Sequence, residues 1–402
     1  MDRNPVATPV RSGLDRLMEE SAWLDSLKGN VAYLCHAASV DRRLRHGIDL
    51  LHGRLGSRLK AVFSPQHGLY GEAQDDMIES DHAHHPEYGI PVYSLYSETR
   101  RPEPGMLEGI DLLVADLQEV GSRPYTYLST LLLCMEACSE KDIEVLVLDR
   151  PNPVGLLSIE GNVLEADFSS FVGMLPIPMR HGCTIGELAL FARHLCYPDC
   201  RLRVLPVGAY ARWMHYGDTG LPWITPSPNM PSPLAALVFA GTVLIEGTNI
   251  SEGRGTVLPF ELIGHPALKA GRWLSDLNDE TAAVGLAGFA LRPQHFTPVF
   301  HKWAGRSCGG FQVHVTDRYT YRPWRTGQWL LREMYSELGS EFTWKEPPFE
   351  YEYERLPIDL LNGSAYPHRW VERYGALDDL AELEQEGMQE YLARREEVLL
   401  YR

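Results

Sequence analysis

The chain has 402 residues, of which 44% are apolar and 23% charged, and this composition excludes a largely disordered protein. At roughly 100–200 residues per domain, the length favours two domains. With 37 basic and 54 acidic residues the net charge is −17, which disfavours general binding to nucleic acids or anionic membranes, because both need surfaces rich in Lys and Arg.

Short apolar runs alternate with helix-like stretches through the first half of the chain. The runs at residues 31–35, 59–64, 90–95, 110–115 and 143–148 predict buried strands, and the stretches at 15–27, 42–55 and 125–140 predict helices. This alternation indicates an α/β fold with a Rossmann-like, doubly wound parallel sheet. Ligands bind beyond the carboxyl ends of such strands, so the polar loops that follow the strands are the first candidates for a site.

Three of these loops are rich in side chains that carry chemistry. They contain Gln66, His67 and Glu72; Asp116, Gln118, Glu119, Arg123, Tyr125 and Tyr127; and Asp149, Arg150 and Asn152. We expect the loops to converge on one edge of the sheet, with His67, Gln118 and Arg150 near the carboxyl ends of the strands.

The second half of the chain has a different pattern. Residues 222–233 are Pro-rich and predict an extended segment, and residues 247–259 form a Gly-rich loop. Strands are predicted at 288–291 and 311–316, and helices at 327–338 and 377–399. We therefore expect a Rossmann-like catalytic domain over residues 1–205 and a smaller C-terminal α+β domain over residues 206–402, which contributes to the cleft.

Several cofactor and metal motifs are absent. No GxGxxG sequence follows a strand and opens a helix, so nicotinamide or flavin binding is not expected. P-loop and GxSxG motifs are also missing. The His and Asp residues at 81–85, with Asp75, Asp76 and Glu79 nearby, have no recognised ligand spacing, and a solvated loop is favoured over a metal site. We expect no cofactor and no metal.

The cysteines and the apolar segments suggest a compartment. The seven cysteines are scattered and contain no CxxC pair, which disfavours a disulfide scaffold. The N-terminus has no apolar signal region, and the longest apolar stretch, residues 127–138, is too short to span a bilayer. These features predict a cytoplasmic protein without membrane insertion.

Some candidate residues have a structural explanation as well as a functional one. Thr184 and Glu187 have the spacing of a helix capping box, which is sufficient to explain this glutamate. Arg150 either forms a buried ion pair with Asp149 or binds a ligand. Glu246 is either functional or paired with Arg254. One of Tyr125 and Tyr127 is expected in the core, whereas Arg180 and His181 have no structural explanation and are candidates to face a ligand.

Six segments of the chain resemble a known family. They are FSPQHGLYGEAQDDM, DLQEVGSRPYTY, LDRPNPVG, PIPMRHGCTIGELA, PSPNMP and EGTNISEGRGTVLPFE. Together they are similar to the exo-β-N-acetylmuramidases of the NamZ type, long known only as a domain of unknown function. The resemblance implies a Rossmann-like catalytic domain, a smaller C-terminal domain and a cleft between them. It also implies hydrolytic release of terminal, non-reducing N-acetylmuramic acid from peptidoglycan fragments, in cell-wall turnover or recycling, without a metal or organic cofactor.

The resemblance directs attention to carboxylates. Glycosidases generally need one carboxylic acid to protonate the leaving oxygen and a second carboxylate as base or nucleophile. Many family members have Glu in a PEHG motif where this chain has Gln66, and an amide cannot donate a proton as a general acid. Glu119 stands where relatives usually have Asp. The candidate catalytic residues are Gln66, His67, Glu72, Asp116 and Glu119, with Glu72 as the nearest replacement for the missing acid and Glu246 as a further carboxylate.

Muramic acid carries a lactyl carboxylate, which a planar guanidinium binds through two hydrogen bonds. Arg123, Arg150, Arg180 and Arg254 can supply that positive charge, and asparagines suit sugar hydroxyls or the acetamido group. The candidate substrate-binding residues are Arg123, Tyr125, Tyr127, Asp149, Arg150, Asn152, Arg180, His181, Asn229, Glu246, Asn249, Ser251 and Arg254.

Two other functions stay open at this point. One is a muropeptide-binding protein that kept the cleft and lost hydrolysis through Gln66. The other is a hydrolase that acts on a different acidic or N-acetylated sugar. In each case the expected ligand is a small saccharide or muropeptide rather than a nucleic acid.

Overall fold

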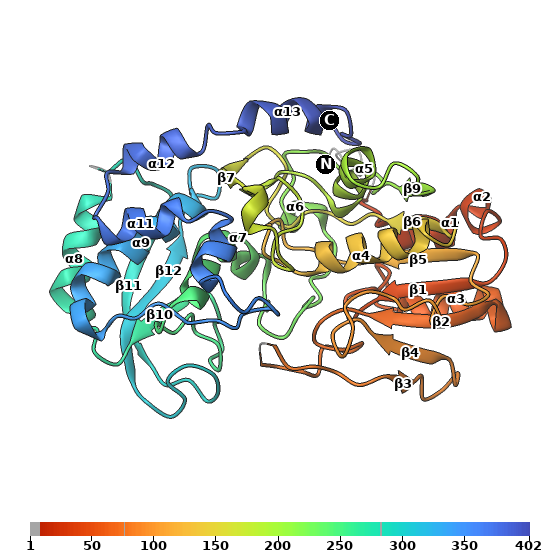
Figure 1. Ribbon diagram of the computed structural model, residues 1–402, viewed down its shortest axis with the longest axis horizontal. Coiled ribbons are helices and arrows are strands. Elements are labelled where there is room, and N and C mark those ends of the chain that lie inside the picture. Colours follow the sequence, from red (N-terminus) through yellow and green to blue (C-terminus); the bar gives the residue numbers. More distant parts are fainter. Residues whose placement is uncertain (1–8, 76, 282–283) are drawn as a thin grey trace, which may run out of the picture.

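The computed structural model describes residues 9–75, 77–281 and 284–402, which form two halves lying side by side (Figure 1). One half is built on a seven-stranded sheet with the order β3-β4-β2-β1-β5-β6-β9. Its strands are β1 (Val31–Cys35), β2 (Leu59–Ser64), β3 (Ala83–His84), β4 (Pro91–Ser94), β5 (Leu112–Asp116), β6 (Glu144–Leu148) and β9 (Leu202–Leu205). Neighbouring strands pair in parallel, except that the edge strand β3 runs antiparallel to β4. The predicted α/β class is confirmed.

Helices cover both faces of this sheet. On one face, Tyr33 and Cys35 of β1 pack in a core with α1 (Gly13–Glu19) and α3 (Gly47–Leu55). On the other face, Ala32 and Leu34 pack in a second core with α4 (Tyr127–Ser139) and α5 (Ile185–Leu195). Because both faces are covered, consecutive residues of each central strand are buried, which explains the continuous apolar runs in the sequence.

The other half contains an antiparallel sheet with the order β10-β12-β11. Its strands are β10 (Leu262–His265), β11 (Phe289–Phe296) and β12 (Cys308–Val315), and the helices around it include α7 (Pro233–Thr242), α8 (Ala270–Glu280), α9 (Pro323–Leu338), α10 (Pro357–Asn362) and α11 (Tyr366–Glu372). Helices α7 and α9 approach so closely that a Cβ on Gly241 would lie 1.9 Å from the Pro323 carbonyl oxygen. This half is the smaller α+β unit that the sequence predicted.

Short elements connect the two halves or extend them. They are α2 (Ser21–Leu24), the hairpin β7 (Glu160–Val163) and β8 (Pro178–Arg180), α6 (Tyr216–Thr219), α12 (Leu377–Leu383), α13 (Met388–Glu396), and the 3₁₀ turns η1 (Gly56–Arg58), η2 (Ala166–Phe168), η3 (Val243–Gly247) and η4 (Gly339–Glu341). The division of the chain at residue 205 remains a proposal.

Three predicted helices are wrong in their extent. The stretch at 15–27 is divided into α1 and α2, and the helix predicted from residue 42 begins only at Gly47. There, Asp41 accepts hydrogen bonds from the amides of Arg43 and Arg45 and holds a non-helical turn. The long helix predicted at 377–399 is broken into α12 and α13 by Gly387, whose φ of +69° is left-handed.

The carboxyl ends of β1 and β5 form the point where the strand order reverses. In chain order the parallel strands have the Rossmann arrangement 3-2-1-4-5-6, and ligands of such sheets occupy the crevice at this point. Here Tyr216 and the segment 221–224 enter that crevice, and a space of only about 20 Å³ remains beside Gln118 and Arg150. As predicted, His67, Gln118 and Arg150 follow the carboxyl ends of β2, β5 and β6.

His36 holds the lining of this crevice in place. Its Nε2 accepts a hydrogen bond from the Gln118 amide at 2.9 Å, and its Nδ1 lies 3.2 Å from the Pro226 carbonyl oxygen. A neutral imidazole with its proton on Nδ1 satisfies both contacts. Burial, and then the charge of Arg150, hold the pKa of His36 well below its usual range.

A buried guanidinium ties the two halves together. Arg123 donates from Nη1 to the carbonyl oxygens of Asn162 and Ile177 at 2.8 and 2.9 Å, and from Nη2 to those of Leu361 and Asn362 at 3.2 and 2.6 Å. The first pair of carbonyls belongs to the segments of β7 and β8, and the second lies at the end of α10. One side chain therefore fixes backbone from both halves.

The C-terminal tail makes a second connection. Helix α13 leads back along the upper edge of the molecule towards the Rossmann-like half (Figure 1). Beyond it, the Tyr401 hydroxyl donates to Asp149 and accepts from the Val207 amide at 2.8 Å, and the Leu400 amide donates to Glu187 at 2.9 Å. The tail is thus bonded to the loops after β6 and β9 and to the first turn of α5.

We expect Arg123→Met to lower the free energy of unfolding by at least about 3 kcal/mol, because four buried carbonyls lose a charged donor. Denaturant unfolding measures this change. Arg101→Met is the matched control, since Arg101 pairs with Glu136 and Glu140 on the surface, and its midpoint should stay close to that of the parent protein. Equal midpoints for both variants would contradict the role assigned to Arg123.

The low pKa of His36 predicts a loss of stability in acid. An unfolded histidine titrates near pH 6.5, so below that pH the unfolded state binds a proton that the folded state excludes. Stability is therefore full above about pH 6.5 and falls as the pH drops. Between pH 7.5 and 5.5, His36→Gln should lose about 1 kcal/mol less unfolding free energy than the parent protein. His84→Gln, at an exposed position, is the control and should keep the parent's pH dependence.

Candidate active site

A narrow, partly open cavity lies where the loops after β2 and β5 meet the C-terminal half. Seven of the predicted site residues line it: Gln66, His67, Tyr125, Tyr127, Asn229, Glu246 and Arg254. Thr126, Ser227 and Glu350 add further polar groups, and Phe239, Phe260 and Phe349 add apolar walls. The cavity volume is about 40 Å³, which holds a few water molecules but no sugar ring. A sugar ring therefore fits only if the wall of this cavity moves.

Gln66 lies at the centre of a hydrogen-bonded chain across this cavity. Its Oε1 accepts from the Thr126 hydroxyl at 2.8 Å, and its Nε2 donates to Glu350 Oε1 at 3.2 Å. The next residue, His67, has a left-handed φ of +76° and places its Nδ1 2.8 Å from the Ala73 carbonyl oxygen. This conformation costs a non-glycine residue energy and is held here by the contacts of the loop.

The C-terminal half contributes a charged cluster to the cavity wall. Arg254 Nη2 lies 2.5 Å from Glu246 Oε1, and Arg254 Nε lies 3.4 Å from the buried Glu252. Glu252 also binds Lys302 at 2.9 Å. Although burial acts to raise the pKa of Glu252, the charge of Lys302 and its neighbours holds that pKa well below its usual range. Glu246 is therefore both paired with Arg254 and part of the cavity wall.

Two tyrosines at the start of α4 form an aromatic wall. The rings of Tyr125 and Tyr127 lie 4.7 Å apart, and Tyr125 meets Phe239 edge-on at 6.0 Å. The Tyr127 hydroxyl donates to the Pro226 carbonyl at 2.6 Å. Burial raises the pKa of both hydroxyls, so the phenols stay neutral. Both tyrosines are buried and both line the cavity.

The loop after β6 stays outside the cavity. Arg150 forms an ion pair with Asp116, with its Nε at 2.5 Å and its Nη2 at 2.9 Å, and Tyr33 donates to the same carboxylate at 2.7 Å. The pairing of Arg150 is thus with Asp116 rather than with Asp149. Asp149 instead accepts from the Thr184 hydroxyl at 2.7 Å and the Gly186 amide at 2.8 Å.

Other predicted residues bond within the fold, away from this cavity. Asn152 donates to the Cys183 carbonyl at 2.8 Å, Asn249 donates to the Glu341 carbonyl at 2.8 Å, and Ser251 accepts from the Gly253 amide at 3.2 Å. Arg180 donates to the Val154 carbonyl, and burial lowers its pKa to about 10. Arg123 binds the four carbonyls described above. Glu72 is exposed and accepts from the Tyr70 amide at 3.1 Å.

Glu119 is buried without lining the cavity. Its Oε2 accepts from the Gly121 amide and lies 3.5 Å from His181 Nε2. Its Oε1 has no hydrogen-bond partner within residues 9–75, 77–281 and 284–402. Because buried polar atoms are normally satisfied, this oxygen is a candidate to bind an ordered water. The capping box of Thr184 and Glu187 is confirmed at the start of α5.

The cluster at 81–85 has partners of its own. His82 Nδ1 accepts from the Ser94 amide at 3.1 Å, and His85 Nε2 lies 3.2 Å from the Tyr70 hydroxyl. Asp76 lies outside the described residues. Among the residues that the structure describes, no three His, Cys, Asp or Glu side chains are placed to hold a metal ion.

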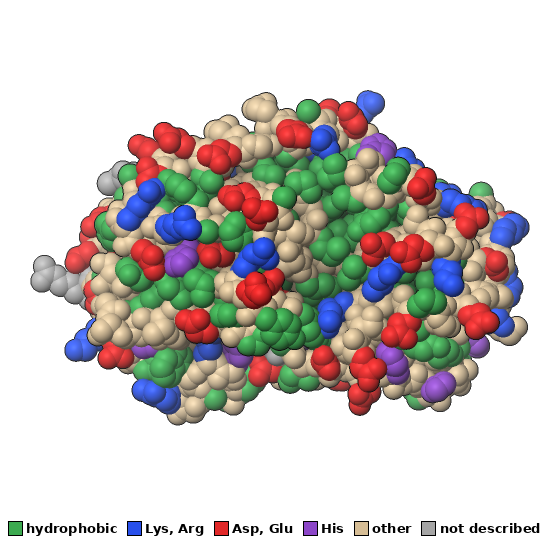
Figure 2. Space-filling model, in the orientation of Figure 1, with side chains coloured by type: hydrophobic (Ala, Val, Ile, Leu, Met, Phe, Trp, Pro, Cys, Tyr) green, Lys and Arg blue, Asp and Glu red, His purple; other side chains and the backbone are tan. Residues whose placement is uncertain are grey.

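Acidic side chains are spread over both halves of the surface seen in Figure 2, with basic side chains among them.

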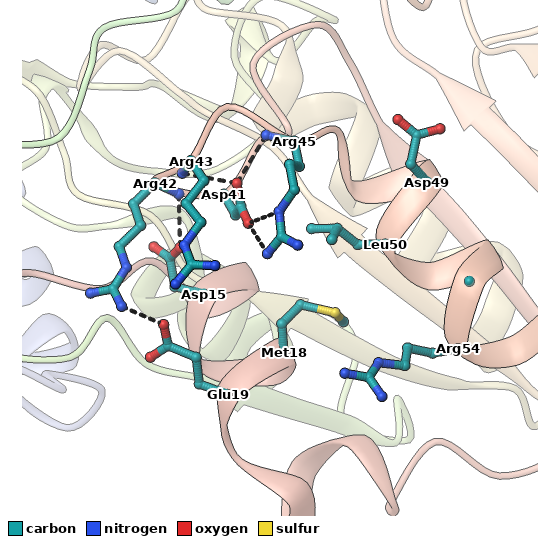
Figure 3. Close-up of a pocket in the computed structure, with 11 residues that line it drawn as sticks. Asp15, Met18, Glu19, Asp41, Arg42, Arg43, Arg45, Asp49, Leu50 and Arg54 are labelled. Carbon is teal, nitrogen blue, oxygen red and sulfur yellow. Dashed lines mark hydrogen bonds and ion pairs between the residues drawn. The ribbon is translucent and has the colours of Figure 1, made fainter.

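A wider depression of about 480 Å³ lies beside α1 and α3, and Figure 3 shows its lining. Its lining includes Asp15, Glu19, Asp41, Asp49, Arg42, Arg43, Arg45 and Arg54, so acidic and basic residues balance. Arg42 pairs with Glu19 at 2.7 Å and Arg45 with Asp41 at 2.6 Å. With no aromatic wall and no net charge, it is a poorer saccharide site than the cavity at Gln66.

Sequence reasoning missed Glu350. It lies in a tract, PPFEYEYE, where several glutamates alternate with aromatic residues, and nothing in that pattern distinguishes one carboxylate from the next. Its hydrogen bond to Gln66 joins positions 284 residues apart, so only the tertiary structure reveals it.

None of the described helices is both long and apolar enough to cross a membrane.

Comparisons with known proteins agree with the two-part architecture. The chain matches the N-terminal domain of the family described as exo-beta-N-acetylmuramidase NamZ over residues 31–234 and the C-terminal domain over residues 237–401. It is 36% identical over 393 residues to the peptidoglycan beta-N-acetylmuramidase NamZ of Bacillus subtilis (strain 168), covering 98% of this chain and 91% of that protein. Two DUF1343 family proteins of Bacteroides fragilis NCTC 9343 have similar structures. One has a TM-score of 0.86 at 30% identity (99% of this chain, 100% of that chain), the other 0.75 at 27% (98% and 99%).

Proposed function

The chain belongs to the NamZ family of exo-beta-N-acetylmuramidases, and we propose that it hydrolyses peptidoglycan fragments at the cavity around Gln66, Glu246 and Glu350. The activity is that of a glycosidase releasing N-acetylmuramic acid from the non-reducing end. The observation that carries the proposed location is that polar and aromatic residues from both family domains meet in this cavity.

The size of the cavity bears on how substrate enters. Its volume of about 40 Å³ is too small for a sugar ring, and residues of the C-terminal half form part of its wall. A terminal sugar therefore enters only when this wall moves. We therefore propose an opening motion between the loop after β2 and the segment around Glu350.

Recognition of muramic acid is assigned to the charged wall. Arg254 lines the cavity and lies between Glu246 and Glu252, so binding the lactyl carboxylate requires the guanidinium to exchange one of these partners. Tyr125 offers an aromatic surface for the sugar ring. Asn229, whose Nδ2 donates to the Gln74 carbonyl at 2.8 Å, keeps its amide oxygen for a sugar or acetamido N–H or O–H donor.

The hydrolysis itself needs a second carboxylate besides the acid. Glu246 fits this role because it faces the cavity, while its pairing with Arg254 favours the charged form. The negative charge would stabilise the positive charge that develops on the sugar ring as the glycosidic bond breaks. Asp116, held by Arg150 and Tyr33, is engaged elsewhere.

One observation favours a second candidate function. Gln66 stands where many relatives carry a glutamate, and a site without its acid would bind muropeptides without cleaving them.

We also propose a cytoplasmic location, which is supported by the seven cysteines, all of them free thiols.

The purified protein should release the chromophore from 4-nitrophenyl β-N-acetylmuraminide and should be inactive, or much slower, on the N-acetylglucosamine counterpart. The physical reason is that only the first compound carries the lactyl carboxylate. Absorbance of the freed nitrophenolate measures both rates. Binding of N-acetylmuramic acid without any turnover would favour the binding protein, and faster turnover of a different acidic sugar would contradict the proposed specificity.

Arg254→Lys should weaken the binding of N-acetylmuramic acid about 5–150-fold, which corresponds to 1–3 kcal/mol for the lost charged hydrogen bond. Binding of N-acetylglucosamine should change little, because this sugar has no lactyl group. Inhibition constants of the two sugars in the chromogenic assay give the comparison. Arg306→Lys, at an exposed position, is the control. An equal loss for both sugars would show that Arg254 does not read the carboxylate.

A further inference from the structure

One segment of the C-terminal half reaches across to the Rossmann-like half. Residues 347–353 lie between η4 and α10, and three contacts fix them on loops of the other half (Figure 1). The Glu350 amide donates to Met77 Sδ at 3.5 Å, and the Tyr351 hydroxyl donates to Glu79 at 3.0 Å. The guanidinium of Arg100 lies 3.3 Å from the centre of the Tyr351 ring.

The backbone of this segment is adapted to position one carboxylate. Glu350 and Tyr351 have φ values of +46° and +67°, a left-handed conformation that L-residues avoid unless their surroundings impose it. The result is that the Glu350 side chain points into the cavity and is 5% exposed. Its Oε2 accepts from the Tyr96 hydroxyl at 2.8 Å, and its Oε1 accepts from Gln66 Nε2 at 3.2 Å.

Gln66 fixes this carboxyl group through its amide. Because Thr126 donates to Gln66 Oε1, the amide nitrogen faces Glu350. A glutamate at position 66 would instead face a second carboxylate across about the same 3.2 Å, and one of the two would have to hold a proton. With glutamine at position 66, the group of this pair that can hold a proton is Glu350.

The two cavity carboxylates have different hydrogen-bond donors. Glu246 lies 2.5 Å from the Arg254 guanidinium, which favours the charged form, whereas Glu350 accepts hydrogen bonds from the neutral groups of Gln66 and Tyr96. The Gln66 amide nitrogen donates to a Glu350 oxygen in either protonation state, and the Tyr96 hydroxyl can donate to the carboxylate or accept from the carboxyl O–H. Two carboxyl groups of unlike environment are the arrangement that glycoside hydrolysis requires.

We propose that Glu350 is the general acid of this site, an inference that depends on the proposed function. As the bond between C1 and the glycosidic oxygen breaks, its electron pair passes to the oxygen, and the proton of the Glu350 carboxyl completes the leaving alcohol. Water then adds its hydroxyl to C1, and over the cycle its remaining proton restores the Glu350 carboxyl. Gln66 is a positioning residue that holds the carboxyl against the substrate.

The test compares Glu350→Gln on two substrates that differ in their leaving group. On a disaccharide of N-acetylmuramic acid and N-acetylglucosamine, turnover should fall about 10²–10⁴-fold, because the sugar alkoxide leaves only when protonated. On 4-nitrophenyl β-N-acetylmuraminide, the loss should be about tenfold or less, since nitrophenolate leaves without a proton. The alkaline limb of the kcat/KM profile, where the acid loses its proton, should also disappear for the disaccharide.

Glu354→Gln is the matched control, since it makes the same change at an exposed position of the same tract. A folded Glu350→Gln protein with the parent's rate on the disaccharide would overturn the proposal, and so would equal losses on both substrates, which indicate a structural role. If Glu350→Gln does not fold, Glu350→Asp gives the same comparison, because it withdraws the acid by one methylene. A parent protein without turnover on either substrate contradicts the proposed function itself, whereas an active parent with an unaffected variant contradicts only the role of Glu350.

Discussion

The buried guanidinium of Arg123 is the interaction on which the arrangement of the two halves depends. A guanidinium presents five N–H donors in a rigid plane, and here four backbone carbonyls, two from each side of the seam, accept from it. The loop that carries Arg123 continues directly into Tyr125, Thr126 and the first turn of α4. The same contact that joins the halves therefore sets the position of the cavity wall, and Leu361, whose carbonyl oxygen accepts from Arg123, lines the cavity as well.

Placing a site at such a seam has a consequence for its chemistry. The Rossmann-like half supplies an amide, a histidine and two neutral phenols, while the other half supplies the carboxylates Glu246 and Glu350 and the cation Arg254. Neither half alone carries a full set of groups for glycoside hydrolysis. In the proposed opening motion, substrate entry separates these two sets and closure reunites them. Closure would then exclude water and assemble the charged groups in one event, which strengthens each interaction between them.

The arginines show why residue type and loop position do not suffice to assign a binding role. Arg123, Arg150, Arg180 and Arg254 all lie in polar loops or beside strands, and the sequence treats them alike. In the structure Arg123 and Arg180 bind carbonyls, Arg150 binds Asp116, and Arg254 alone of the four lines the cavity. A buried guanidinium takes whichever acceptors the fold leaves unsatisfied, and those acceptors belong to segments distant in sequence.

The sequence by itself determined the features that depend on local periodicity and on neighbouring residues. The continuous apolar runs located the central strands because a sheet covered on both faces needs no polar positions, and Thr184 with Glu187 specified a helix start within four residues. The six motifs identified the family. Only the tertiary structure decided where helices break, which of the four arginines reaches the cavity, and that Glu350 faces Gln66 across 284 positions. The physical reason is that hydrogen bonds and burial at the site depend on distances in space, and a seam between two halves joins segments that no local pattern connects.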